Sequence, residues 1–179
     1  MKRFQRGLTI AALLLAACGG TDKPAPQGDA DPAIAALNDS ISKDTSNWQL
    51  QANLANTLRH KNRVDEAMAA AQKAFMLAPA PAVEAQLVMA KVHAAAERPA
   101  SAINIVKSIE KKRAAAEINV DEVEIAEVYG VLGDTEAVFR WLARAETAHS
   151  PNLTGLAGNA DLASVHADAR WPHYAETYK

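Results

Sequence analysis

Apolar residues recur at helical spacing along almost the whole chain from Asp31 onward. Apolar side chains three or four positions apart lie on one face of an α-helix, so this pattern predicts a succession of amphipathic helices. Proline and glycine interrupt the pattern at intervals, at positions where helices begin or end. The predicted helices cover residues 32–43, 47–60, 64–77, 82–96, 99–113, 120–132 and 135–148.

Individual residues mark some of the helix ends. Gly133 followed by Asp134 predicts a helix stop and then an N-cap, because glycine adopts the left-handed conformation and aspartate accepts from free backbone N–H groups. Asn119 with Glu122 three residues later fits a capping box at the start of another helix. Pro99 suits the first turn of a helix, where its missing N–H costs nothing.

The composition favours an all-α fold and excludes several functions. Of the 179 residues, 40 are alanine and only 5% are aromatic, which suits closely packed helices and disfavours sheets. The 19 basic and 21 acidic residues give a formal net charge of −2, whereas a nucleic-acid binder needs a concentrated basic face. The single cysteine can form neither an internal disulfide nor a zinc cage nor a redox pair.

The first 18 residues have the parts of a secretory signal. The basic residues Lys2, Arg3 and Arg6 precede an apolar run from Leu8 to Ala17. A run of this length is too short to cross a bilayer, which takes roughly 20 helical residues, but it suits the core of a signal peptide.

The end of this segment, Leu15-Ala16-Ala17-Cys18, resembles the bacterial lipobox. In lipoproteins the signal peptide is cut before the cysteine, whose sulfur takes a diacylglyceryl group and whose new amino terminus takes a further acyl chain. The resemblance implies a signal peptide over residues 1–17 and lipid attachment at Cys18, the alternative being an ordinary signal peptide. Gly19 resembles the residue that accompanies sorting to the outer membrane, which implies a protein facing the periplasm.

The rest of the chain is expected to have three parts. Removal of residues 1–17 would take away three basic residues and no acids, which changes the formal net charge from −2 to −5. Residues 18–30 contain glycine and proline but no large apolar residue, so we expect a flexible linker. A helical repeat domain is expected over residues 31–148 and a C-terminal cap over residues 149–179, as a loop followed by two short helices.

The helices between residues 46 and 148 resemble tetratricopeptide repeats, which are helix–turn–helix units of about 34 residues with small or apolar side chains at set positions. Units that start at Trp48, Val83 and Asn119 place suitable residues there. These residues are Leu54, Ala55, Leu58, Ala67, Ala71 and Ala74 in the first unit, Met89, Ala90, His93, Ala102, Val106 and Ile109 in the second, and Ile125, Ala126, Tyr129, Val138, Leu142 and Ala145 in the third.

The third unit and the end of the chain resemble known tetratricopeptide sequences more closely. Tyr129-Gly-Val-Leu-Gly-Asp134 is similar to a repeat variant of bacterial tetratricopeptide proteins, and Asp168-Ala-Arg-Trp171 is similar to the segment that closes such arrays. The resemblance implies a right-handed α-solenoid of about three helix pairs, with an N-terminal capping helix at residues 32–43 and a short C-terminal helical cap that uses Trp171 and Tyr174. A generic antiparallel helical bundle is the alternative.

No residue pattern indicates catalysis, a metal or a cofactor. The chain lacks the motifs of a phosphate-binding loop, a zinc protease and a serine hydrolase. His166 and His173, with Asp168 between them, are the histidines closest in sequence, and we expect them to pack in the cap rather than to bind metal. The acidic residues of the third unit are expected on a solvated helix face, namely Glu122, Glu124 and Glu127.

The resemblance also implies a binding surface, because the first helix of each tetratricopeptide pair lines a concave groove. Carried over position by position, the groove residues are Gln49, Asn53, Asn56, Arg59, His60, Glu84, Lys91, Glu124 and Glu127. Asparagine can both donate to and accept from the backbone of a bound segment. Basic residues face acidic ones, so capture of a partner's terminal carboxylate is disfavoured.

The sequence therefore predicts a membrane-anchored adaptor or assembly factor of the cell envelope, without enzymatic activity, that binds a protein or peptide segment in this groove. A self-associating scaffold, and hence a homo-oligomer, is the first alternative. An accessory subunit of an envelope enzyme complex is the second.

Overall fold

The computed structural model describes residues 31–80 and 82–179. The predicted signal peptide over 1–17, the lipid attachment site Cys18 and the linker over 18–30 lie outside the described residues. Within the described ranges the regular structure is helical and no strand occurs, which confirms the all-α fold class.

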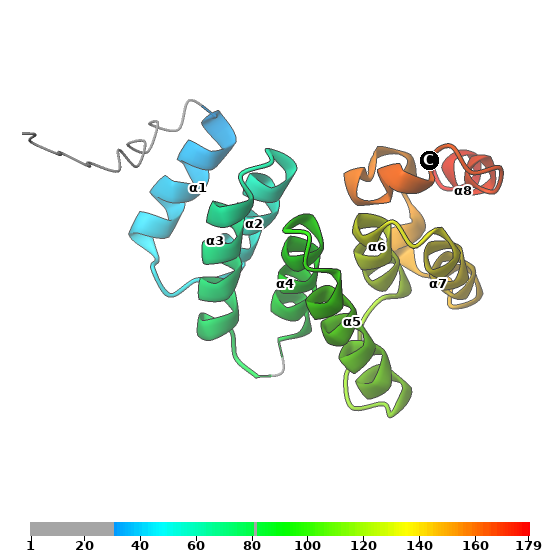
Figure 1. Cartoon of the computed structure of the whole chain (residues 1–179), viewed down its shortest axis with the longest axis horizontal. Helices are drawn as coiled ribbons and strands as arrows, with labels where there is room; N and C mark the ends of the chain where they lie inside the picture. Colours follow the sequence, from blue (N-terminus) through cyan, green and yellow to red (C-terminus); the bar gives the residue numbers. More distant parts are fainter. Residues whose placement is uncertain (1–30, 81) are drawn as a thin grey trace, which may run out of the picture. The chain divides into compact units, whose positions relative to one another are not determined.

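Seven of the helices match the predicted ones, with ends that differ by no more than two residues. They are α1 (Pro32–Lys43), α2 (Trp48–His60), α3 (Val64–Leu77), α4 (Val83–Ala95), α5 (Pro99–Ala114), α6 (Glu122–Leu132) and α7 (Thr135–Thr147). Figure 1 shows them following one another in chain order.

Local capping explains where several helices begin and end. Gly133 ends α6 in the left-handed conformation with φ of 75°, and the Asp134 side chain accepts from the Ala137 N–H at the start of α7, as predicted. The predicted capping box at Asn119 and Glu122 is wrong by two residues, since Asp121 and Glu124 form it. The chain stays non-helical through Val120 because that side chain is buried in the core and its carbonyl accepts from Arg113 Nε.

Alanine allows the helices to pack closely. From α1 to α6, each helix contacts the next one, and α2 also contacts α4, which in turn contacts α6. The completely buried side chains in these contacts are mostly small. They include Ala55, Ala67, Ala71, Ala74, Ala85, Ala90, Ala102, Ala126, Ala137 and Ala145. Helix α4 joins two apolar clusters, because Val88 and Val92 pack toward α2 and α3 while Leu87 and Ala90 pack toward α5 and α6.

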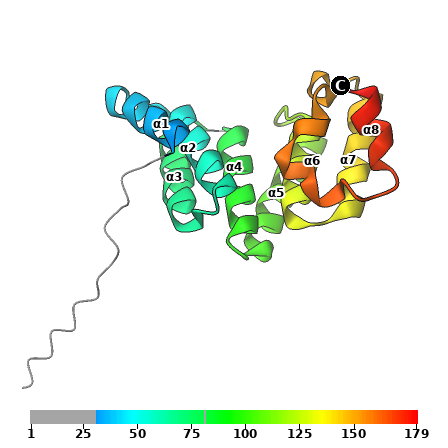
Figure 2. The same ribbon diagram turned by 90° about the horizontal axis from the view of Figure 1, so that it is seen from above.

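The C-terminal segment wraps back onto α6 and α7. It contains the short 3-10 helices η1 (Pro151–Leu153), η2 (Leu156–Gly158) and η3 (Ala160–Val165), followed by α8 (Trp171–Thr177). The predicted loop therefore contains two helical turns that periodicity did not reveal. Trp171 and Tyr174 are buried as expected, and Tyr174 packs on Phe139 of α7 with ring centroids 5.8 Å apart. In Figure 2, as in Figure 1, this segment lies beside α6 and α7.

Candidate functional site

The predicted groove contains a buried ion-pair network centred on Asp161. Oδ1 of Asp161, in η3, lies 2.6 Å from Nη2 of Arg59 and 2.9 Å from Nε2 of His60, both at the C-terminal end of α2. Oδ2 of the same carboxylate lies 2.9 Å from Nζ of Lys91 in α4. One carboxylate thus accepts from side chains of two separate helices.

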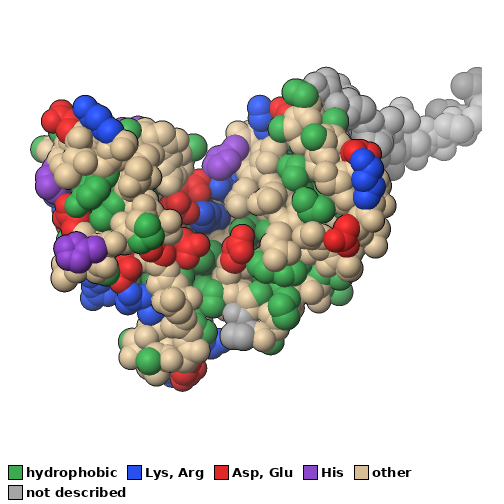
Figure 3. All heavy atoms as spheres, turned by 180° about the vertical axis from the view of Figure 1, so that it is seen from behind, with side chains coloured by type: hydrophobic (Ala, Val, Ile, Leu, Met, Phe, Trp, Pro, Cys, Tyr) green, Lys and Arg blue, Asp and Glu red, His purple; other side chains and the backbone are tan. Residues whose placement is uncertain are grey.

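Helix α6 joins the same network. Lys91 also pairs with Glu127, and Asn159 Nδ2 donates to Glu127 Oε1 over 2.7 Å. Asn159 Oδ1 accepts from the Asp161 N–H, which fixes the turn that presents the aspartate. Figure 3 shows basic, acidic and histidine side chains gathered in a hollow at the centre of one face.

The network is buried and electrically balanced. The side chains of Arg59, Asp161 and Lys91 are 6%, 7% and 10% exposed. Two cations, Arg59 and Lys91, face two carboxylates, Asp161 and Glu127, which leaves no formal net charge apart from His60. Pairs of this kind contribute conformational specificity more than stability, yet loss of one partner leaves an uncompensated buried charge.

Burial and ion pairing act in opposite directions on the pKa values. Burial alone would raise the pKa of Asp161, but Lys91 and Arg59 lower it to about 2. Burial alone would lower the pKa of Lys91, but the carboxylates of Glu127 and Asp161 raise it above its usual value. Asp161 and Lys91 are therefore charged at neutral pH.

A glycine within α6 lets the C-terminal segment approach. A Cβ atom at Gly130 would lie 2.2 Å from the backbone oxygen of Asp161, far inside contact distance. The Ser164 hydroxyl donates to the Gly130 carbonyl over 2.8 Å, which holds η3 against the helix. Leu162 and Val165 of η3 are completely buried in the core. The segment is therefore a fixed part of the fold rather than a readily displaced one.

The structure places seven of the nine predicted groove residues in two groups. Arg59, His60, Lys91 and Glu127 come together in the Asp161 network, which we call the closed half of the groove. The others are not part of that network. Gln49, Asn53 and Glu84 are exposed and lie toward the N-terminal ends of α2 and α4; we call these three the open half.

The remaining two predicted residues have specific surroundings. Asn56 lies between the two halves along α2, and its Oδ1 is buried without a hydrogen-bond partner among the described residues. Glu124 accepts from the Asp121 N–H in the capping box, and burial raises the pKa of its carboxyl. Asn56 is thus a neutral acceptor, and the Glu124 carboxyl is engaged by the backbone at the start of its own helix.

The expectation of a solvated acidic face on α6 is wrong. Glu122 is buried and pairs with Arg113, Glu124 is half-buried, and Glu127 is held by Lys91 and Asn159. The spacing of these glutamates along α6 carries no information on the neighbouring elements. Side chains from α4, α5 and the C-terminal segment cover that helix.

Sequence reasoning missed Asn159 and Asp161, which bind four of the predicted groove residues. Gly130 is one sequence feature that could have indicated them, because a glycine inside a helical pattern often marks a place where another backbone segment packs closely against the helix. The second was the Asn-Ala-Asp run at residues 159–161, whose side chains favour a turn.

The structure provides no metal-binding arrangement in residues 31–80 and 82–179, where no group of three or more potential ligands occurs. His166 stacks on Trp171, His173 Nε2 lies 2.6 Å from Glu146, and Asp168 pairs with Arg170. Burial, with a smaller contribution from Arg98, lowers the pKa of His93.

Among the helices described here, none is both long and apolar enough to span a bilayer.

Comparison with known proteins identifies no relative: no family model, curated protein or solved structure matches the chain. The likeness to tetratricopeptide repeats and to lipoprotein leaders therefore rests on the residues quoted above. The function is argued from those residues and from the geometry of the groove.

Proposed function

We propose that this chain is a lipid-anchored adaptor of the bacterial cell envelope that binds a protein segment along α2 and α4. In this proposal, Cys18 carries the anchor and residues 31–148 form a short solenoid of tetratricopeptide-like pairs. Two or more acyl chains would hold the protein at the membrane, because one chain alone binds only marginally. Gly19 favours the outer membrane, with the folded part in the periplasm.

The packing supports the repeat architecture. Helices α2 and α3, α4 and α5, and α6 and α7 pack as consecutive pairs. The first helices of these pairs, α2, α4 and α6, also contact one another in order. Completely buried alanines stand at the positions of the first two pairs where the repeat pattern calls for small residues, namely Ala55, Ala67, Ala90 and Ala102.

One observation supports the functional proposal most directly: helices α2, α4 and α6 already bind a segment of the chain itself. The chain's own Asn159 is in extended conformation, with φ of −79° and ψ of 107°. Side chains of α2, α4 and α6 bind this residue and Asp161 through hydrogen bonds and ion pairs. The same face therefore has the chemistry to hold a peptide in cis, and a partner segment would extend this mode over the open half.

The open half offers groups that recognise a backbone. Gln49 and Asn53 each carry an amide donor and acceptor, while Glu84 supplies a negative charge. A buried acceptor without a donor costs free energy, so an N–H from a bound segment would stabilise Asn56 Oδ1. The rigid helices limit the ordering cost to the partner's side.

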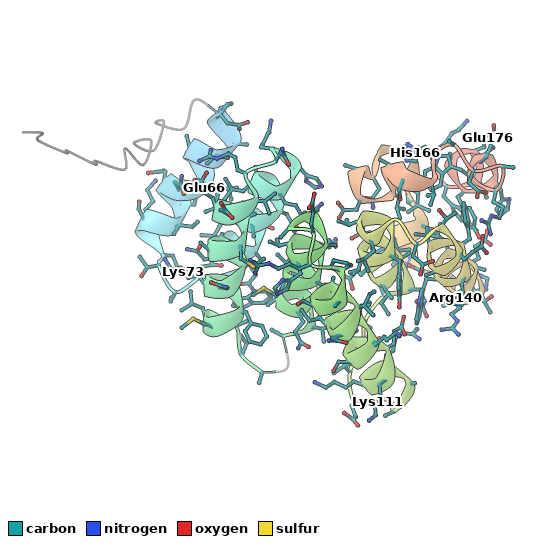
Figure 4. All side chains as sticks on the ribbon, viewed as in Figure 1. Glu66, Lys73, Lys111, Arg140, His166 and Glu176 are labelled. Atoms are coloured by element: carbon teal, nitrogen blue, oxygen red, sulfur yellow. The ribbon has the colours of Figure 1, made fainter. Side chains whose placement is uncertain are left out.

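Crosslinking in envelope fractions of the native host, followed by capture of the full chain, tests the proposal. The variant Gln49→Ala/Asn53→Ala/Glu84→Ala removes the open half. The control Gln72→Ala/Asn104→Ala/Glu176→Ala removes the same residue types at exposed positions on α3, α5 and α8; Figure 4 labels Glu176. A discrete partner should be captured by wild type and control but lost from the open-half variant. Equal recovery with both variants would exclude the groove as the working surface.

A self-associating scaffold is the second candidate, because α3 ends in exposed apolar side chains. Phe75, Met76 and Leu77 are 52%, 83% and 39% exposed, which is unusual for large apolar residues. Light scattering after size exclusion distinguishes the candidates. Oligomers at micromolar concentration that dissociate in Phe75→Ser/Met76→Ser would favour the scaffold, whereas a wild-type monomer would exclude it.

A further inference from the structure

A second polar site lies away from the groove, where the end of α5 meets α7. It is an open pocket of about 440 Å³. Its lining consists of Lys107, Glu110, Lys111, Arg113 and Ala114 from α5, and Trp141 and Arg144 from α7. Figure 4 labels Lys111 at this end of α5.

Two guanidinium groups are held in place around Trp141. The Arg144 guanidinium lies 4.5 Å from the ring centroid and that of Arg113 lies 5.6 Å from it. Arg113 is fixed further, because it donates to the Val120 carbonyl and pairs with Glu122. Cation–π contacts of this kind orient guanidinium groups before any ligand arrives.

The pocket has an excess of positive charge. Lys107, Lys111 and Arg144 take part in none of the ion pairs formed within the part of the chain that the structure describes. Glu110 is the one acid in the lining, and its Oε1 accepts from Trp141 Nε1 and Tyr129 OH. Three cations against one carboxylate leave two formal positive charges, and the Arg113–Glu122 pair is neutral.

The end of α5 does not neutralise these cations. A helix C-terminus carries partial negative charge on its unpaired carbonyls. Here the carbonyls of Lys111, Lys112 and Arg113 accept from the backbone N–H groups of residues 115–117. Ala116 adopts φ of 56° to make this turn. These three carbonyls of the last turn are thus satisfied by the backbone, and the lysine ammonium groups remain available to a ligand.

We propose that this pocket binds a phosphate monoester group. Such a group carries nearly two negative charges at neutral pH, which matches the charge excess, and its oxygens suit both guanidinium and ammonium donors. Inorganic phosphate and the headgroup of phosphatidic acid, which is a phosphate monoester, supply the same chemistry. The site is independent of the groove and of any protein partner.

The test follows the Trp141 indole N–H signal of the full chain by NMR in detergent micelles, with the signal assigned through Trp141→Phe. One arm adds inorganic phosphate and the other adds a short-chain phosphatidic acid, each against chloride at equal ionic strength. The pocket variant is Lys111→Ala/Arg144→Ala. The control Lys73→Ala/Arg140→Ala removes the same charges from exposed positions on α3 and α7; Figure 4 labels Lys73 and Arg140.

We expect a saturable shift of the Trp141 signal in wild type and control, with affinity reduced on the order of tenfold or more in the pocket variant. A response to both additions would indicate any phosphate group, and a response to phosphatidic acid alone would indicate a lipid headgroup. The proposal is overturned if neither addition shifts this signal beyond chloride, or if pocket and control variants respond alike.

Discussion

Nη2 of Arg59 lies 2.6 Å from Oδ1 of Asp161, although the two residues are 102 positions apart in the chain. Both side chains are more than nine-tenths buried. The C-terminal segment packs on α6, and this contact joins it also to α2, an early helix of the chain. It explains why only part of the predicted groove remains open.

Loss of the Asp161 carboxylate should destabilise the fold strongly. In Asp161→Ala, Arg59 would remain buried without a carboxylate partner in the network, and Lys91 would keep only Glu127. Removal of one partner of a buried ion pair typically costs about 3–5 kcal/mol. The free energy of unfolding from urea titration measures this cost. Asp168→Ala is the matched control, because its partner Arg170 is exposed, and it should change stability little. Similar losses in both variants would contradict the assignment.

Gly130→Ala should lower stability, although alanine is the better helix former by about 1 kcal/mol. The added Cβ would meet the Asp161 carbonyl at 2.2 Å, so η3 or α6 must shift. We expect a loss of about 2 kcal/mol or more through this overpacking. Thermal unfolding of Gly130→Ala and Gly158→Ala tests the expectation, since nothing lies within 4 Å of a Cβ at Gly158. A stabilised Gly130→Ala protein would mean that η3 does not lie against α6.

Acid should weaken the fold through Asp161. Folding lowers its pKa from 3.8 to about 2, so the carboxylate stabilises the fold fully above about pH 5, and this contribution is lost progressively as the pH falls through about 2. The contribution is about 2 kcal/mol. Urea titrations of wild type and Asp161→Asn at several pH values measure it by difference. The stability gap between the two proteins should shrink as the pH falls, and a constant gap would contradict the pKa assignment.

Cys18 should carry the lipid. Its thiolate is the nucleophile that the lipobox chemistry requires, so Cys18→Ser should abolish acylation. Metabolic labelling with a fatty acid, read together with the intact mass, checks this in a bacterial host. Label retained in Cys18→Ser, or absent from the wild type, would remove the membrane anchor from the account.

The helices were predictable because their information is local. Proline, glycine and the spacing of apolar residues set the ends of α1 to α7 within two residues. The repeat register predicts that Lys91 faces Glu127, and in the structure the two side chains form an ion pair. The closure by Asp161 could not be predicted in this way, because no periodic pattern relates residues 102 positions apart. The 3-10 turns of the C-terminal segment are too short to show periodicity.

The central claim is that a partner protein binds along the open half of the groove. Site-specific photo-crosslinking tests it most directly. A photoreactive amino acid is placed at Asn53 in the open half, or at Gln72 on α3 as an exposed control. Irradiation of intact cells of the native host should join the Asn53 position to one discrete protein and leave the Gln72 position without that adduct. No adduct at Asn53, or the same adduct from both positions, would contradict an adaptor that binds its partner along α2 and α4.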